Sequence, residues 1–173
     1  MFTKNFKKLM SLYLLNGYES GRSEVTYRIS TTLTALDGTV ITTEASGTSD
    51  ERYSIAYALS DTLSTEAKEM RAYLVIGTGT GTISDDDYRL FESTSDCTCV
   101  SASSNTSANF NKIYTATFQN NTSADITITE TGMVAKSFLY NDFFEVLLDH
   151  TLLDTPVIIP AGESRTITYK WVF

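Results

Sequence analysis

The chain has few of the side chains on which most enzymes depend. Its 173 residues include one histidine, one tryptophan, two cysteines and two prolines. A single histidine excludes every mechanism that needs two, and two cysteines exclude a small scaffold held together by many disulfides. Lysine and arginine total 13 against 21 acidic residues, so the formal net charge is −8. Because a surface that neutralises phosphates needs clustered cations, we expect no nucleic-acid partner.

Small hydroxyl side chains and aromatic rings are abundant instead. The chain holds 27 threonines, 19 serines, ten tyrosines and nine phenylalanines. Threonine and the aromatic residues fit a pleated, half-buried surface, so the composition favours an all-β fold. The length suits one domain, and neither a linker nor an internal repeat divides it. We therefore predict a single domain over residues 1–173.

The first 16 residues combine lysines with an apolar run. Lys4, Lys7 and Lys8 precede apolar residues 9–15, as in a signal peptide, but no small-residue cleavage site follows. The run is far shorter than the ~20 residues of a membrane span, so we expect no membrane partner. Helical spacing predicts an amphipathic helix or arm over residues 1–16, which docks either on its own domain or on a neighbour. Its apolar stripe consists of Phe2, Phe6, Leu9, Met10, Tyr13 and Leu14.

Most of the remaining sequence alternates between apolar and polar residues, which predicts strands. Residues 24–44 predict a hairpin around Asp37 and Gly38, because Asp-Gly favours a type I′ turn. Residues 64–70 hold helix formers after a serine and predict one or two helical turns. Residues 93–109 are rich in Ser, Thr and Asn and predict a long polar loop or a poorly ordered sheet edge. Further strands are predicted over residues 53–59, 72–76, 113–119, 125–130, 132–139, 143–153, 157–159 and 165–173.

The last predicted strand follows a turn at residues 160–163 and separates an apolar face from a polar one. The apolar face consists of Ile167, Tyr169, Trp171 and Phe173. Short strands with turn signals every 8–12 residues or so are typical of β-sandwiches. The sequence therefore predicts an all-β, antiparallel β-sandwich of jelly-roll type, with a short N-terminal helix or arm.

Two short motifs suggest ligand sites and favour plainer structures. Gly77, Gly79 and Gly81 alternate with threonines. The third glycine of a dinucleotide fingerprint would fall on Thr82, and the lysine of a P-loop is absent. We interpret this segment as a flexible turn or surface loop. Residues 85–87 are three consecutive aspartates, whereas a calcium loop spaces its acids at alternate positions. We interpret them as the first turn of a short helix capped by Ser84.

The cysteines and the histidine give no catalytic or metal centre. Cys97 and Cys99 are two apart, so a bridge between them would be strained, and two sulfurs do not complete a zinc site. We expect reduced thiols, with a bridge between subunits as the alternative. His150 has no Gly-x-Ser-x-Gly elbow to serve, so we expect it to have a structural role. We predict no catalytic residue, no metal and no cofactor.

The glycine run at residues 77–82 is followed by Asp86-Asp87-Tyr88-Arg89-Leu90. This stretch resembles the GxGTxxxxxxDYxL segment of small virion structural proteins of tailed bacteriophages. Residues 126–132, 147–150 and 157–169 are similar to the ITEIGL, LLxRxxL and VxVxAGxxxTVTYxxxF patterns of their C-terminal half. The resemblance covers roughly residues 72–173. It implies a non-enzymatic part of a tail, neck or head surface, present in several copies and assembled in the host cytoplasm.

The resemblance and the residues together predict a virion subunit that associates with itself and with other virion proteins. The predicted interface residues are Phe2, Phe6, Leu9, Met10, Tyr13, Leu14, Tyr169, Trp171 and Phe173. One alternative is a carbohydrate- or receptor-binding module of a tail or fibre, with exposed aromatics around Tyr18, Tyr53 or Tyr88. A remote alternative is a small glycan hydrolase, which needs two facing carboxylates in a cleft.

Overall fold

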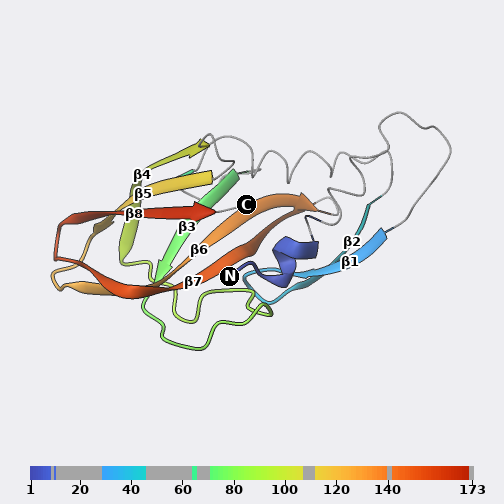
Figure 1. Ribbon diagram of the computed structural model, residues 1–173, viewed down its shortest axis with the longest axis horizontal. Coiled ribbons are helices and arrows are strands. Elements are labelled where there is room, and N and C mark those ends of the chain that lie inside the picture. Colours follow the sequence, from blue (N-terminus) through green and yellow to red (C-terminus); the bar gives the residue numbers. More distant parts are fainter. Residues whose placement is uncertain are drawn as a thin grey trace.

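Eight strands hold most of the residues that the computed structural model describes, and they form three antiparallel sheets (Figure 1). The structure describes residues 1–8, 10, 29–45, 64–65, 71–106, 112–139 and 142–171. One sheet pairs β1 (Ile29–Thr34) with β2 (Val40–Ala45). A second has the order β3 (Arg71–Gly77), β6 (Ile126–Leu139), β7 (Asp142–Ile159). The third has the order β4 (Cys97–Thr106), β5 (Lys112–Asn120), β8 (Ser164–Trp171). The all-β prediction is confirmed.

The hairpin predicted within residues 24–44 is confirmed as β1 and β2, with a different turn. The amide of Gly38 donates to Ala35 O (2.9 Å), and the amide of Ala35 donates to Thr39 O (2.9 Å). Gly38 has a φ of 88°. These bonds define a three-residue loop that ends in a left-handed glycine, in place of the predicted two-residue type I′ turn.

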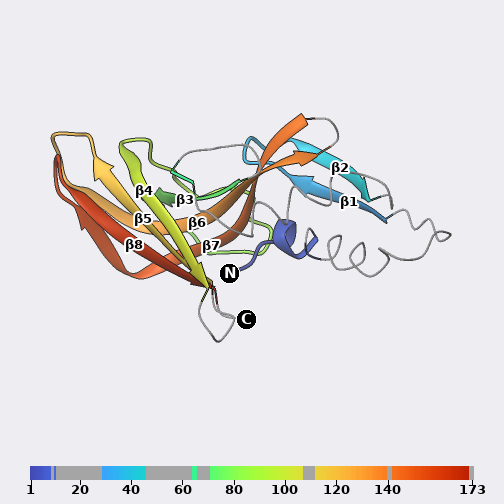
Figure 2. The ribbon, with the colours of Figure 1, turned by 90° about the horizontal axis from the view of Figure 1, so that it is seen from above.

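Strands β6 and β7 are longer than predicted, because pairs of predicted strands merge. Segments 125–130 and 132–139 form one strand, and segments 143–153 and 157–159 form its partner. The register between β6 and β7 shifts twice, as it does at β-bulges, which let a long strand bend without ending. Figure 2 shows both strands extending toward the β1–β2 hairpin.

Of the two alternatives predicted for residues 93–109, the polar loop is wrong, because β4 occupies most of the segment, and the sheet edge is the one that the structure shows. β4 lies at the edge of its sheet and pairs with β5 along nearly its whole length. Exposed Ser101, Ser103 and Asn105 alternate with half-buried Ala102 and Ser104. Hydroxyl side chains on the solvent face of an edge strand give the composition of a loop while keeping the period of a strand.

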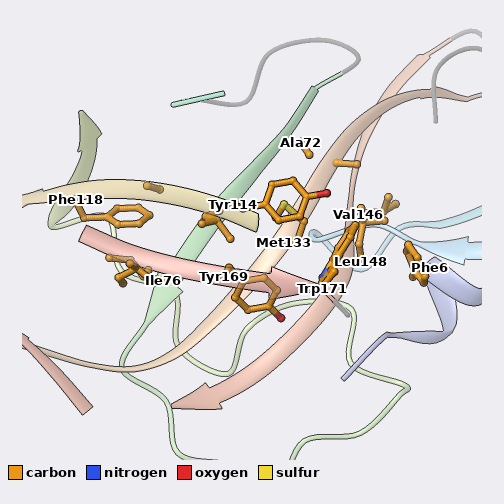
Figure 3. Close-up of a cluster of buried hydrophobic side chains, with 14 of the residues drawn as sticks. Phe6, Ala72, Ile76, Tyr114, Phe118, Met133, Val146, Leu148, Tyr169 and Trp171 are labelled. Carbon is orange, nitrogen blue, oxygen red and sulfur yellow. The ribbon is translucent and has the colours of Figure 1, made fainter. Parts of the chain in front are cut away.

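One hydrophobic core draws side chains from both three-stranded sheets (Figure 3). Ile76, Met133 and Leu148 come from the β3–β6–β7 sheet, while Phe118 and Trp171 come from the β4–β5–β8 sheet. Burying each such side chain stabilises the fold by about 1.5–3 kcal/mol. Hydrophobic burial between these two sheets is therefore the main source of stability.

Three polar links also join the two sheets. They are Trp171 Nε1 to Asp149 Oδ2 (3.0 Å), the Tyr169 hydroxyl to Thr151 Oγ1 (2.8 Å), and Asn120 Nδ2 to Ile159 O (2.9 Å). The turn predicted at residues 160–163 is present, with Gly162 at a φ of 70°. However, the strands that it connects, β7 and β8, lie in different sheets. Side chains rather than a backbone ladder therefore connect these two strands.

The N-terminal residues pack on their own chain. Residues 4–8 and 10 are helical, and the predicted continuation to residue 16 lies outside the described residues. Thr3 caps this helix, since its Oγ1 accepts from the amide of Phe6 (3.3 Å). The amide of Thr3 donates to Leu148 O (3.0 Å), and the amide of His150 donates to Met1 O (3.1 Å). The first residues thus extend the sheet at the edge of β7. No helix among the described residues has the length and apolar character of a membrane span.

Candidate functional site: a buried carboxylate–histidine network

The only histidine of the chain lies between two carboxylates. His150 Nε2 is 2.9 Å from Glu130 Oε2, and His150 Nδ1 is 2.7 Å from Asp87 Oδ2. The side chains of His150 and Glu130 are fully buried, and that of Asp87 is 14% exposed. Each ring nitrogen therefore has a carboxyl oxygen within hydrogen-bond distance. The network is an imidazole ring held between two carboxyl groups.

The sheet register and one turn bring these three residues together. Glu130 lies on β6, and His150 lies on β7 opposite Gly132, two positions along from Glu130. The two side chains are therefore diagonal neighbours on one face of the sheet. Asp87 comes from a turn in which its Oδ2 also accepts from the amide of Ser84 (3.0 Å).

Glu130 accepts hydrogen bonds from three backbone amides as well as from the histidine. Its Oε1 accepts from the amides of Gly79 (3.0 Å) and Glu92 (2.8 Å), and its Oε2 accepts from the amide of Phe91 (3.0 Å). Burial alone would raise the pKa of Glu130. The hydrogen bonds from Glu92, Phe91, His150 and Gly79 together outweigh burial, and the pKa of Glu130 is lowered. Glu130 is therefore a stably ionised anchor for the segment that follows β3.

Two glycines are required because this segment lies directly against the carboxylate. A Cβ on Gly77 would lie 2.4 Å from Glu92 O and 2.5 Å from Glu130 Oε1. A Cβ on Gly79 would lie 2.5 Å from the Cβ of Phe91 and 2.6 Å from Glu130 Oε1. Both glycines are buried. The prediction of a flexible turn or surface loop is therefore wrong for these two residues, which permit close packing around a buried charge.

The three aspartates form a turn rather than the predicted start of a helix. The amide of Asp87 donates to Ser84 O (3.2 Å), and Ser84 Oγ accepts from the amide of Asp86 (3.2 Å). With no helix following, the three carboxylates point to different partners. Asp87 binds His150, and the other two pair with lysines of the N-terminal helix.

Asp85 and Asp86 connect this turn to the N-terminal helix. Lys7 Nζ lies 3.0 Å from Asp85 Oδ2, and Lys4 Nζ lies 2.6 Å from Asp86 Oδ1. The hydrogen bond that Lys7 donates lowers the pKa of Asp85, and the hydrogen bond that Lys4 donates to Asp86 raises the pKa of Lys4. The amide of Lys4 also donates to Asp85 O (2.6 Å). The turn therefore links the N-terminal helix to the buried histidine.

The imidazole at the centre of this network is enclosed by its partners. Both ring nitrogens of His150 are bound to carboxylates, and the Phe91 ring lies 4.7 Å from the imidazole, centre to centre. A general base needs a nitrogen within hydrogen-bond reach of a nucleophile or substrate. The arrangement instead fixes the segment between β3 and β4 onto β6 and β7. The structural role predicted for His150 fits this geometry, but its two partners were not foreseen.

The described interface candidates are mostly buried in their own chain. Phe6, Tyr169 and Trp171 are 7%, 7% and 4% exposed, and Phe2 and Met10 are partly buried against the same core. The rings of Phe2 and Phe6 stack with their centroids 4.3 Å apart, and both contact the Trp171 ring. Docking on the own domain thus occupies these side chains. The other candidates, Leu9, Tyr13, Leu14 and Phe173, lie outside the described residues, and their place in an interface remains a prediction.

The remaining candidate groups add no second site. Cys97 and Cys99 are free thiols, and burial raises the pKa of each. Within the described ranges, no group of three or more His, Cys, Asp or Glu side chains is arranged to hold a metal ion. Tyr88 is half-buried with the Arg89 guanidinium 5.4 Å above its ring. Tyr18 and Tyr53 lie outside the described residues.

Comparison with known proteins gives no assignment: no protein-family model, no curated protein and no solved structure matches the chain. The chain's own residues therefore carry the functional argument.

Proposed function

We propose that this chain is a non-enzymatic structural subunit of a bacteriophage virion, located in the tail, the neck or the head surface. In this proposal it acts by self-association and by docking to other virion proteins. As part of this proposal the fold is an antiparallel β-sandwich of jelly-roll type, and the core shared by the two three-stranded sheets supports it. The resemblance of residues 72–173 to virion structural proteins supports the same function.

The observation that carries the proposal is the internal use of the reactive groups. His150, the only histidine, is fully buried, and its two nitrogens bind Glu130 and Asp87. Three backbone amides complete the coordination of Glu130. An enzyme needs such groups to face a substrate, whereas a structural subunit can use them to hold its own segments together. The geometry favours the second role.

The carbohydrate-binding alternative has less support. Sugar sites in sandwiches combine polar groups with exposed aromatic rings. A hollow of about 560 Å³ lies between the segment before β4 and the start of β6, and it is rich in hydroxyl and acidic groups. None of its described lining residues is aromatic. We therefore keep the structural subunit as the main proposal.

The test is the mass of the isolated chain as a function of concentration. Light scattering coupled to size exclusion should give a mass well above the 19.1 kDa of one copy, rising with concentration. A virion subunit that docks on identical neighbours must show this association, because its interfaces are self-supplied. A constant mass of one copy across the accessible concentration range would contradict the proposal.

A further inference from the structure

Residues 78–92 form the β3–β4 loop, which is closed at its base and appears as the green trace below the N-terminus in Figure 1. The amide of Thr78 donates to Glu92 O (2.9 Å), and the amide of Thr94 donates to Ile76 O (3.2 Å). The two ends of the loop therefore lie side by side. Compact loops of roughly 6–16 residues with adjacent ends are held together by their own side chains. Such a loop can open as one unit about its base.

The β3–β4 loop covers Glu130 and His150 on the sheet beneath it. Glu130 accepts hydrogen bonds from three loop amides, those of Gly79, Phe91 and Glu92. The Phe91 ring lies 4.7 Å from the imidazole of His150, centre to centre. Both covered side chains are fully buried. The loop is therefore the lid of this carboxylate–histidine pair.

The tip of the loop is a turn with an inner and an outer side. On the inner side, Asp87 Oδ2 lies 2.7 Å from His150 Nδ1, whereas Asp85 and Asp86 pair with two lysines of the N-terminal helix. The amide of Asp87 donates to Ser84 O (3.2 Å), and the amide of Ser84 donates to Asp87 Oδ2 (3.0 Å). These two hydrogen bonds close the turn. A displacement of the outer carboxylates therefore displaces Asp87 as well.

The N-terminal helix is itself fixed to strands outside the loop. The amide of Thr3, at the start of the helix, donates to Leu148 O on β7 (3.0 Å). The side chain of Asn5 donates to Thr34 O (2.7 Å) and accepts from the Thr34 amide (3.0 Å) on β1. The helix is thus a fixed support to which the tip of the loop is tied.

The contacts between the helix and the turn form a latch. It consists of the ion pairs Lys4–Asp86 (2.6 Å) and Lys7–Asp85 (3.0 Å) and the hydrogen bond from the Lys4 amide to Asp85 O (2.6 Å). Both lysine side chains are about half exposed. Exposed ion pairs are individually weak, so the latch can release without unfolding of the core.

We propose that the docked N-terminal helix latches the β3–β4 loop closed over His150, and that release of the latch opens the loop and exposes the histidine. The two events are coupled because one closed turn carries both the latch carboxylates and the partner of His150. This inference goes beyond the proposed function, since it concerns the isolated chain.

Charge reversal on each side of the latch, alone and combined, tests this coupling. The helix variant is Lys4→Glu with Lys7→Glu, and the turn variant is Asp85→Lys with Asp86→Lys. Each variant places like charges across the latch, so hydrogen exchange at the three loop amides bound to Glu130 should accelerate about tenfold. The combined variant again places opposite charges across the latch. Its exchange should return to within about twofold of the wild-type rate.

His150 provides a second measurement at a single site. It is the only histidine of the chain, so its reaction with diethyl pyrocarbonate is followed by mass spectrometry of the peptide that contains it. The reagent needs an accessible ring nitrogen, and both nitrogens are covered when the loop is closed. This modification should accelerate by a similar factor in the helix variant and in the turn variant, and it should recover in the combined variant.

Arg165→Glu is the matched control. Arg165 forms an ion pair with Glu163 (2.9 Å) that is about as exposed as those of the latch and lies at the start of β8. The control should change exchange at the loop amides by less than ~twofold. Amides of β5, the central strand of its sheet, should exchange at the wild-type rate in every variant. The single reversals Lys4→Glu and Asp86→Lys replace any double variant that thermal unfolding shows to be unfolded.

The outcomes separate a latch from a general loss of stability. Faster exchange in the loop and faster modification of His150 in both one-sided variants, with recovery in the combined variant, support the proposal. Unchanged rates in both one-sided variants overturn it, as does a combined variant that does not recover. Faster loop exchange without faster modification of His150 overturns the role of the loop as a lid. Equal acceleration in β5 shows global unfolding and overturns the local opening.

Discussion

Replacing Glu130 by glutamine tests whether the buried network holds the fold together. The side chain keeps its shape, and Oε1 can still accept from the amides of Gly79 and Glu92. The other oxygen, Oε2, which lies beside the Phe91 amide and His150 Nε2, is replaced by the NH2 group of the glutamine side chain. This NH2 group cannot accept the hydrogen bond of the Phe91 amide. The change thus leaves one buried amide unpaired and removes one hydrogen bond to a charged group.

The expected cost follows from these two losses. An unpaired buried donor costs about 1–3 kcal/mol, and a hydrogen bond to a charged group contributes about 1.5–3 kcal/mol. We therefore expect Glu130→Gln to lower the free energy of unfolding at pH 7 by about 3 kcal/mol. For a chain of this size the melting temperature should fall by roughly 6–12 °C. Urea denaturation and calorimetry measure the two quantities.

The same variant carries a pH signature. The pKa of Glu130 is lower in the folded chain than its ordinary value of 4.5, so the ionised carboxylate stabilises the fold above that pH. This stabilisation is lost as the pH falls from 4.5 toward the folded-state pKa. The difference in unfolding free energy between wild type and Glu130→Gln should therefore shrink below pH 4.5.

The control is Glu163→Gln, which changes the same atoms at the surface. Glu163 and Arg165 are about half exposed, and exposed pairs contribute about 0–1 kcal/mol. If Glu130→Gln and this control lower the free energy of unfolding at pH 7 by amounts within ~0.5 kcal/mol of each other, the network is not a structural anchor. A loss that stays constant down to pH 3 would also contradict the reasoning, because it would not depend on ionisation.

Two further predictions concern the packing around the network and the N-terminal helix. Gly79→Ala should destabilise the fold by about 1–3 kcal/mol, because its Cβ would lie 2.5 Å from that of Phe91. Gly81→Ala is the matched comparison and should cost less, since it meets the tip of the exposed Phe91 ring, which can rotate away. Urea denaturation of both variants decides, and equal costs would contradict this account. Asn5→Ala should cost about 1–3 kcal/mol, because the buried Asn5 side chain both donates to Thr34 O (2.7 Å) and accepts from the Thr34 amide (3.0 Å). Hydrogen exchange at the Thr34 amide should become faster in this variant, and unchanged exchange would show that the N-terminal helix does not hold β1.

The sequence predicted the parts of the fold that local patterns determine. Alternation predicted most strands, and Gly38 and Gly162 were correctly placed in turns, where each has a positive φ. The error over residues 93–109 has a physical cause. A strand whose outward face is all Ser, Thr and Asn has the composition of a loop, and only its pairing with β5 distinguishes the two.

The buried network could be predicted only in part, because it depends on contacts distant in sequence. Glu130 follows Ile126 and Ile128 at alternate positions of β6, which is a signal for a buried acid. Its partners come from 38 to 51 positions upstream and from His150, 20 positions downstream. No local pattern indicates that Gly79 approaches this carboxylate.

The most direct test of the account is a cryo-EM map of the assemblies that the wild-type chain forms. We expect repeated copies in contact with one another. His150 should lie enclosed between Glu130 and Asp87 in every copy. A map of single, separate copies, or one in which His150 lines an open cleft that holds a bound ligand, would contradict the account.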